Sequence, residues 1–330
     1  ANALSSVTVL PTHRRRGLLT RWMHDEISRA RDAAAPVSIL IASEAPIYGR
    51  FGFGVAATSC PWTLDTRDAR FRRPAGGTVA IVSPETFAEH APAVYEAARR
   101  RQPGAIDRRP TWWEHLAQLR PGPGEPDRHR VLTLHRAPDG TVDGALAYRV
   151  HEHWHDRVSR NRLEIADLVT ASDAAYADLW RYCAEVDFVS TVTAPDRSPD
   201  EPLPWLLHDP RAARTGPVSD FLWARLHDVP AALTARRYPV AGRLVLEVAD
   251  DATSRWLLEV ADDGTAACTP TGADADLRLG VDSLASLWLG GVSPASLHRA
   301  GRLDAASDRA LARAGALFSW PDPAWCGTWF

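Results

Sequence analysis

Lysine is missing from this sequence: all 38 basic side chains belong to arginine, and 41 acidic residues leave a formal net charge of −3. Without a surplus of positive charge the chain has no overall attraction for a phosphate backbone, so nucleic acid is not expected as its main ligand. The sequence also has no unbroken apolar run of the roughly 18 residues that a membrane-spanning helix needs. We therefore expect a soluble globular protein that crosses no membrane.

Cysteine is scarce and scattered. Cys60, Cys183, Cys268 and Cys326 lie far apart, with none of the close pairs typical of zinc sites or disulfide frameworks. Isolated thiols are common in reducing compartments, and residues 1–4 show neither the basic nor the apolar region of a secretory signal. These features favour a cytoplasmic protein.

A metal site has little support. His151, His153 and His155 alternate and would share one face of a strand, which is an arrangement that metal ligands can have. Their neighbours Asp156 and Arg157 are charged, so a solvated strand end is the simpler interpretation. We expect no metal cofactor.

The chain is too long for one ordinary core, since domains usually contain about 100 to 200 residues. A cluster of Arg, Pro and Gly at 72–77 and a proline-rich stretch at 194–217 mark two changes of composition. We predict domains at 1–71, 72–217 and 218–330. Helix and strand patterns occur in all three, which indicates an α/β fold class.

The first region predicts the order strand, basic loop, helix, strand. The β-branched run at 7–10 favours a strand that Pro11 ends. After the loop, apolar residues at helical spacing run from Leu18 until Pro36, and an apolar strand is expected at 37–42.

The loop between that strand and helix has the chemistry of an anion site. It contains Arg14, Arg15 and Arg16 and ends in Gly17, directly before the helix. First-turn N–H groups of a helix have no internal partner, and the helix dipole favours negative charge there. The alternative is that the three arginines only form a solvated charged surface.

The second and third regions repeat simple patterns. Residues 163–193 predict strand, helix, strand, as in the first region, but no basic glycine loop precedes the helix. A loop rich in proline and glycine is expected at 120–126. In the third region, two similar runs at 243–248 and 255–260 predict a hairpin.

Two segments of the first region resemble the Gcn5-related N-acetyltransferases (GNAT), and more narrowly their Eis (enhanced intracellular survival) branch. Residues 7–19 read Val-Thr-Val-Leu-Pro-Thr-His-Arg-Arg-Arg-Gly-Leu-Leu, and residues 42–54 read Ala-Ser-Glu-Ala-Pro-Ile-Tyr-Gly-Arg-Phe-Gly-Phe-Gly. The general GNAT motif has Gly or Ala where this chain has Leu19, and Leu fits the Eis branch. The aromatic end of the chain, 320–330, agrees with that branch.

The resemblance covers the whole chain and implies its architecture. It implies tandem GNAT-like domains with a splayed central sheet, the second of them degenerate, and a third domain like sterol carrier protein. A GNAT domain has several elements before the strand expected at 7–10, so the part of the acceptor pocket that they supply is expected upstream of Ala1. Eis-like proteins are hexamers, which implies a homo-hexamer here.

The resemblance also implies where acetyl-CoA binds. In the family, the arginine and glycine loop holds the pyrophosphate, and main-chain N–H groups of the preceding strand, here near Val9, hold the thioester carbonyl. The implied cofactor-binding residues are Val7, Val9, Arg14, Arg15, Gly17, Leu18 and Ser43.

Tyr48 stands where the family has its general acid, which protonates the leaving thiolate. A tyrosine pKa near 10 lies only about 1.5 units above the pKa of about 8.5 of a thiol, so the proton transfer carries a small penalty of about 2 kcal/mol. The alternative is a packing aromatic residue beside Phe51 and Phe53.

The family assigns the base that deprotonates the incoming amine to the chain's own terminal carboxylate, here that of Phe330. An α-carboxylate has a pKa of about 3.5 in water and is a weak base unless desolvation raises it. The aromatic side chains of Trp325 and Trp329 would supply such surroundings. The alternative is that the tail only packs.

The function implied by the resemblance is acetyl-CoA-dependent N-acetylation of a small-molecule primary amine by direct attack, without a covalent enzyme intermediate. Aminoglycosides are the family's known substrate class, and other polyamine-like acceptors fit the same chemistry. The rival hypothesis is a non-enzymatic scaffold that binds CoA or lipid or serves in assembly. The intact loop at 14–17 speaks against this rival.

Overall fold

The computed structural model describes residues 1–120, 129–250 and 252–330. Most of the loop expected at 120–126 therefore lies outside the described residues. Among the described helices, none has both the length and the apolar character needed to cross a membrane.

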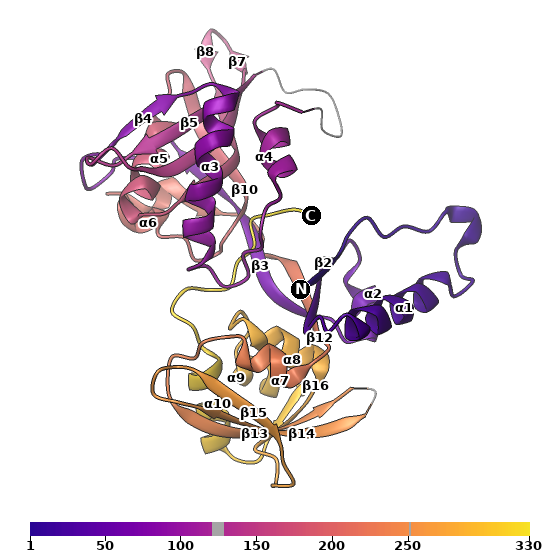
Figure 1. The fold of residues 1–330 in the computed structure, drawn as a ribbon. Helices are drawn as coiled ribbons and strands as arrows, with labels where there is room; N and C mark the ends of the chain where they lie inside the picture. Colours follow the sequence, from indigo (N-terminus) through magenta and orange to yellow (C-terminus); the bar gives the residue numbers. More distant parts are fainter. Residues whose placement is uncertain (121–128, 251) are drawn as a thin grey trace. The chain divides into compact units, whose positions relative to one another are not determined.

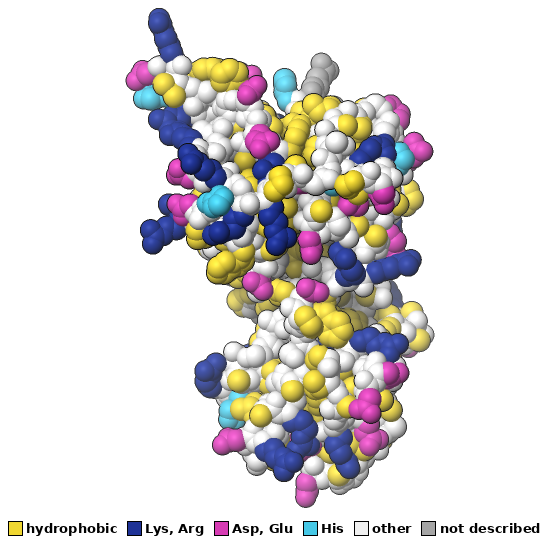
Figure 2. Space-filling model, turned by 90° about the vertical axis from the view of Figure 1, so that its left-hand side faces the viewer, with side chains coloured by type: hydrophobic (Ala, Val, Ile, Leu, Met, Phe, Trp, Pro, Cys, Tyr) yellow, Lys and Arg dark blue, Asp and Glu magenta, His cyan; other side chains and the backbone are white. Residues whose placement is uncertain are grey.

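The chain forms two compact units. One consists of residues 1–58 together with 220–330, and the other of residues 59–219. Figure 1 shows the helices and strands of both units with the labels used below. Figure 2 shows one face of the molecule, on which basic and acidic side chains are interspersed.

The start of the first unit combines strands and helices around β2. β1 pairs with β2 in parallel, and β2 pairs antiparallel with β12, which comes from much later in the chain. The elements are β1 (Asn2–Leu4), η1 (Pro11–His13), α1 (Leu18–Asp32), β2 (Val37–Ile41), α2 (Ala45–Tyr48), η2 (Gly49–Phe51), β3 (Gly54–Asp65) and β12 (Ser219–Leu226).

The strand expected at 7–10 is wrong in position. The paired residues are those of β1, with Asn2 opposite Ser38, and residues 5–10 belong to no strand. Ser6 has a φ of 56°, in the left-handed region, which turns the chain away from β2 before the β-branched run begins. The β-branched residues at 7–10 favour a strand locally, but they have no neighbouring strand to pair with.

Helix α1 packs on the strands through one apolar face. Met23, Ile27 and Ala30 recur every three or four residues, and all three are buried. Met23 and Ile27 belong to a core that also contains side chains of β1, β2, β12 and the segment after β2, namely Leu4, Leu40, Tyr48, Phe51, Phe53 and Trp223. This packing fixes the start of α1 relative to the strands.

The carboxyl-terminal part of the first unit is a separate sheet with helices. Its strand order is β15-β14-β13-β16-β17, and the expected hairpin is present, with Leu246 opposite Trp256. The elements are α7 (Val229–Thr234), β13 (Gly242–Ala249), β14 (Thr253–Val260), β15 (Ala266–Pro270), β16 (Leu277–Gly280), α8 (Val281–Trp288), α9 (Pro294–Arg299), β17 (Leu303–Ala305) and α10 (Asp308–Phe318).

The second unit is a mixed sheet with helices on both faces. Strand β3 continues into it, and the strand order is β3-β10-β9-β6-β5-β4. The elements are β4 (Thr78–Ile81), α3 (Pro84–Arg99), α4 (Pro110–Leu116), β5 (Arg130–Arg136), β6 (Val142–His151), β7 (Trp154–His155), β8 (Val158–Ser159), β9 (Asn161–Thr170), α5 (Asp173–Glu185), β10 (Val189–Arg197), α6 (Leu203–Leu206), η3 (Pro210–Ala212) and β11 (Ala213–Thr215).

Alternate side chains of β6 lie on opposite faces of this sheet. Ala145 and Ala147 belong to the core under α3 and α4, whereas Leu146 and Tyr148 belong to the core under α5 and α6. The strand, helix, strand expected at 163–193 is present as β9, α5 and β10, and the two strands pair in parallel.

Candidate active site

The segment that leaves β1 forms one wall of a pocket in the first unit. The pocket has a volume of about 560 Å³. Val7, Val9 and Leu18, three of the residues expected to bind the cosubstrate, line it. Its remaining lining residues are Ser5, Ser6, Thr8, Leu10, His13, Leu19 and Trp22. The walls are therefore mostly apolar side chains and the exposed backbone of an unpaired segment.

Sequence reasoning missed Trp22 and His13 as lining residues. Trp22 stands four residues after Leu18 on α1, so the two side chains lie on the same face of the helix. That spacing is a signal from which Trp22 was predictable. His13 ends η1, and its place at the pocket depends on how the loop folds.

The arginine and glycine loop turns sharply into α1. Arg15 and Gly17 both have a positive φ, of 61° and 72°. A Cβ at Gly17 would meet no atom within 4 Å, so this position needs glycine for its backbone angle and not for space. Gly17 is the N-cap residue and offers no side chain, which leaves the first-turn N–H groups of α1 without a side-chain cap.

The three arginines of the loop differ in their contacts. Arg16 donates from Nη2 to the carbonyl oxygen of Thr12 at 3.1 Å. Arg14 and Arg15 are exposed, and within the described residues neither guanidinium takes part in a hydrogen bond or an ion pair. These two side chains are therefore available to an anionic ligand at the start of α1.

Ser43 lies elsewhere in this unit. It follows β2, is exposed, and is not among the residues that line the pocket beside Val7 and Val9. The structure therefore brings Val7, Val9 and Leu18 together, places the loop of Arg14, Arg15 and Gly17 at the start of α1, and leaves Ser43 outside this pocket.

Tyr48 is the last residue of α2 and is only 6% exposed. Its ring packs edge-on against Phe53, with 6.3 Å between the ring centres. Burial, and to a lesser extent the charge of Glu44, raise the pKa of the phenol above its usual value. The hydroxyl consequently stays protonated at neutral pH, as a proton donor requires, while the ring also packs.

The end of the chain is held against the first unit although it belongs to no helix or strand. Ala324, Cys326 and Thr328 are buried, and the ring of Trp329 packs edge-on against Phe221 of β12 with 5.0 Å between centres. Phe330 is half-buried, and Trp329 is 59% exposed, so the aromatic surroundings expected for the terminal carboxylate are only partly present. Phe221 is a third residue that sequence reasoning missed, because nothing local connects it to the tail.

His151 and His155, which the sequence analysis considered as metal ligands, each lie close to a carboxylate. His151 lies 3.1 Å from Glu164, and His155 lies 3.4 Å from Asp156. No group of three or more potential metal ligands lies close together in the described part of the chain.

Comparison with known proteins gives three family matches. Residues 1–56 and 104–226 each match an acetyltransferase (GNAT) domain, and residues 229–327 match a sterol carrier protein domain. An uncharacterized N-acetyltransferase of Streptomyces griseus is 41% identical over 99% of this chain and 81% of the relative. The N-acetyltransferase Eis of Mycobacterium tuberculosis is 38% identical over 96% of this chain and 77% of the relative.

Solved structures agree with these matches. A crystal structure of Eis1 from Mycobacterium abscessus has a TM-score of 0.84 and 33% identity, and the match covers 99% of this chain and 82% of that one. A GCN5-related N-acetyltransferase from Anabaena variabilis also has a TM-score of 0.84, with 25% identity over 99% of this chain and 81% of that one.

The chain is a Gcn5-related N-acetyltransferase. Within this class it belongs to the Eis-like N-acetyltransferases, with GNAT domains followed by a domain like sterol carrier protein. The expected family, the α/β fold class and the enzyme class are thereby confirmed. A GNAT fold also implies acetyl-CoA as the cosubstrate.

Proposed function

We propose that this enzyme transfers the acetyl group of acetyl-CoA directly to a primary amine of a small molecule, with aminoglycosides and other polyamine-like molecules as the acceptor class. The observation that carries the proposal is the start of α1. Its N-terminus has no side-chain cap, and Arg14 and Arg15 have no described partner beside it. A pyrophosphate suits this place, and the apolar pocket of Val7 and Val9 suits an uncharged thioester arm.

The remaining roles follow from the chemistry of acetyl transfer. The amine nitrogen attacks the thioester carbonyl, the carbon–sulfur bond breaks, and the leaving thiolate takes the proton of the Tyr48 hydroxyl. The carboxylate of Phe330 accepts a proton from the incoming amine. The buried anchors of the tail, Ala324, Cys326 and Thr328, support the assignment of Phe330, and the protonated state of the buried Tyr48 hydroxyl supports its assignment as the acid. Ser43 contacts a part of the cosubstrate that lies outside this pocket.

Three further proposals concern the protein as a whole. We retain the domains 1–71, 72–217 and 218–330, a cytoplasmic location and a homo-hexamer. The absence of a disulfide among the four cysteines, all of them described residues, supports the location, and exposed aromatic side chains such as Trp205 and Phe188 support assembly. Sedimentation equilibrium at micromolar concentration tests the hexamer.

Cosubstrate binding tests the proposal most directly. Hydrogen bonds to charged groups contribute roughly 1.5 to 3 kcal/mol, so Arg14→Ala and Arg15→Ala should each weaken CoA binding about tenfold or more in calorimetry. Arg29→Ala is the matched control, because Arg29 is an exposed arginine on α1 that pairs with Glu26. Wild-type CoA affinity in both loop variants would contradict the assignment of the loop.

The acceptor is identified with an assay that detects the free thiol of released CoA. A panel of aminoglycosides, linear polyamines and simple primary amines is offered with acetyl-CoA. Turnover with the polycationic members supports the proposed class. Thiol release that no amine increases would contradict it.

A further inference from the structure

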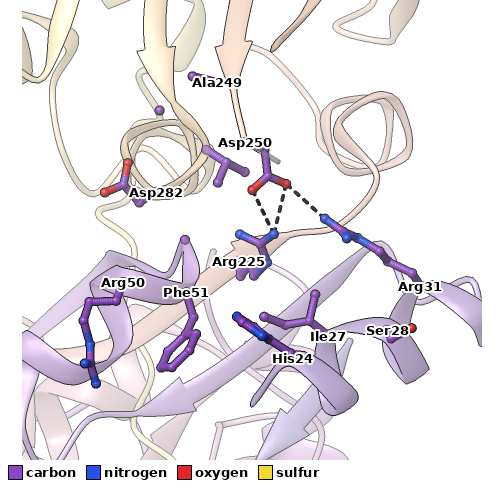
Figure 3. A pocket seen from close by; sticks show the side chains of 13 residues that line it. His24, Ile27, Ser28, Arg31, Arg50, Phe51, Arg225, Ala249, Asp250 and Asp282 are labelled. Carbon is purple, nitrogen blue, oxygen red and sulfur yellow. Dashed lines mark hydrogen bonds and ion pairs between the residues drawn. The ribbon is translucent and has the colours of Figure 1, made fainter. Parts of the chain in front are cut away.

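The turn that carries Tyr48 rests against the carboxyl-terminal domain within the first unit. Beside the turn, a pocket of about 470 Å³ lies between α1 and that domain (Figure 3). Its lining residues come from four places in the chain: α1 with Arg31, the turn with Gly52, β12 with Arg225, and the carboxyl-terminal domain with Asp250, Val281 and Asp282.

The carboxylate of Asp250 joins α1 and β12 to the carboxyl-terminal domain. Figure 3 shows the guanidinium groups of Arg225 and Arg31 directed at Asp250, which directly follows β13. Arg225 donates from Nη2 to both Asp250 oxygens at 2.9 Å, and Arg31 donates to Oδ2 at 3.1 Å. Arg225 is only 3% exposed, so the loss of its carboxylate partner leaves a buried charge and is costly.

Two glycines, Gly52 and Gly54, allow the backbone of the turn to lie directly against Arg225 and α8. Gly52 has a φ of 76°, and a Cβ there would overlap the Nη1 atom of Arg225 and lie 2.8 Å from Cγ1 of Val281. A Cβ at Gly54 would overlap the carbonyl oxygen of Asp282 and lie 2.6 Å from Oγ of Ser286. Real Cβ atoms are not found so close to their neighbours, so only glycine permits this approach.

The opposite side of the turn is open. A Cβ at Gly49 would meet nothing within 4 Å, and the φ of this residue is −55°. Between Gly49 and Gly54, the amide of Gly52 donates to the carbonyl of Gly49 at 3.1 Å and the amide of Phe53 donates to that of Tyr48 at 3.3 Å. The turn is thus tied within itself, contacts the domain at Gly52 and Gly54, and has open space beside Gly49.

We propose that the carboxyl-terminal domain is a positioning element for acetyl transfer: through Gly52, Gly54 and the Arg225–Asp250 ion pair it holds the turn, and with it the Tyr48 hydroxyl, in place. The inference rests on the proposed role of Tyr48. It makes Gly54 and Asp250 positioning residues for turnover. The proposed phosphate contacts lie before the first residue of α1, so CoA affinity should not depend on this contact.

The first pair of variants is Gly54→Ala with Gly49→Ala as its matched control. In Gly54→Ala the turn and α8 must move apart by about 1 Å, and a misplacement of this size can reduce turnover by about 10²-fold. We expect kcat to fall at least tenfold while CoA affinity stays within about twofold. Gly49→Ala should keep turnover within about twofold, since its Cβ enters open space.

The second pair is Asp250→Asn with Asp262→Asn as its control, because Asp262 is an exposed carboxylate in a turn of the same domain. Asp250→Asn should lower kcat without a change in CoA affinity, and Asp250→Glu should restore part of it. In a Tyr48→Phe background, Asp250→Asn should lower kcat little further, because both changes act through the same hydroxyl. If Gly54→Ala does not fold, Asp250→Asn provides the test instead.

Hydrogen exchange provides a readout that does not depend on the role of Tyr48. The amides of Gly52 and Phe53 should exchange at least about tenfold faster in Asp250→Asn, and at the native rate in Asp262→Asn. Native exchange and native kcat in folded Gly54→Ala and Asp250→Asn would overturn the inference. Native turnover in Tyr48→Phe alone would instead contradict the proposed acid, and the exchange rates would still decide whether the domain holds the turn.

Discussion

Moving the carboxylate of Phe330 separates its proposed role as a base from simple packing of the tail. The buried side chains of Ala324, Cys326 and Thr328 anchor the chain up to two residues before its end. One glycine appended after Phe330 therefore moves only the terminal charge, by up to about 3.5 Å. Proton transfer needs heavy-atom distances of about 2.6 to 3.2 Å, and the new peptide carbonyl is no base at neutral pH.

The expected effect is a loss of turnover without a loss of binding. General base catalysis typically contributes 10²-fold to 10⁴-fold, so we expect the glycine-extended enzyme to be at least about 10²-fold slower. CoA affinity and the melting temperature should be nearly unchanged, because the anchors of the tail and the loop before α1 are untouched. The assay is thiol release with the best acceptor of the amine panel, together with calorimetry of CoA.

Two companion proteins make this test decisive. A terminal carboxamide, made by protein semisynthesis, removes the charge at Phe330 without moving any atom before it, and it should be as slow as the extended enzyme. A glycine inserted after Gly272, an exposed residue of the loop between β15 and β16, adds the same residue away from the tail in sequence and should not change the rate. If the glycine-extended enzyme acetylates amines at the native rate, the tail only packs and the base is another group.

Three further predictions concern other residues. Tyr48→Phe removes only the hydroxyl, and it should lower kcat by about 10² to 10⁴ with CoA affinity nearly intact, as measured by thiol release and calorimetry. Calorimetry should find one CoA per chain, because the second unit has no basic glycine loop before α5 and the side chain of Ser172 caps that helix; two sites per chain would contradict this. Burial and the charges of Arg225 and Arg31 lower the pKa of His227 from 6.5 to about 4. The unfolded chain therefore takes up this proton first, so the free energy of unfolding should fall as pH drops from about 6.5 to 4, by about 1 to 2 kcal/mol after discounting for solvent screening of the half-buried ring. Urea denaturation at pH 7 and pH 4.5 should show a smaller fall for His227→Gln, and an equal fall would refute this cause.

The sequence alone determined the elements that depend on near neighbours. The strand, helix, strand of β9, α5 and β10 and the hairpin of β13 and β14 follow from spacings of two to four residues, which local chemistry controls. The same holds for the family, because its two motifs are short and contiguous. The arginine and glycine loop before α1 was predictable in this way, and the hypothesis that it binds an anion rests on residue types alone.

Only the tertiary structure decided which segments meet. The β-branched run after Ser6 was expected to form a strand, but the paired residues are Asn2–Leu4, because a strand needs a partner and β2 offers one only before the chain turns away. Strand β12 pairs with β2 although about 180 residues lie between them. Sequence spacing carries no information on such contacts, because they arise when distant segments exclude water from the same core.

The tertiary structure also decided which contacts single residues near the candidate site make. Gly49 and Gly54 look alike in the sequence, but one faces open space and the other faces the backbone of α8. Arg225 and Asp250 are two of many charged residues, and burial of the arginine makes their ion pair important. A residue's type determines which interactions it can form, and packing against remote parts of the chain determines which of them are formed.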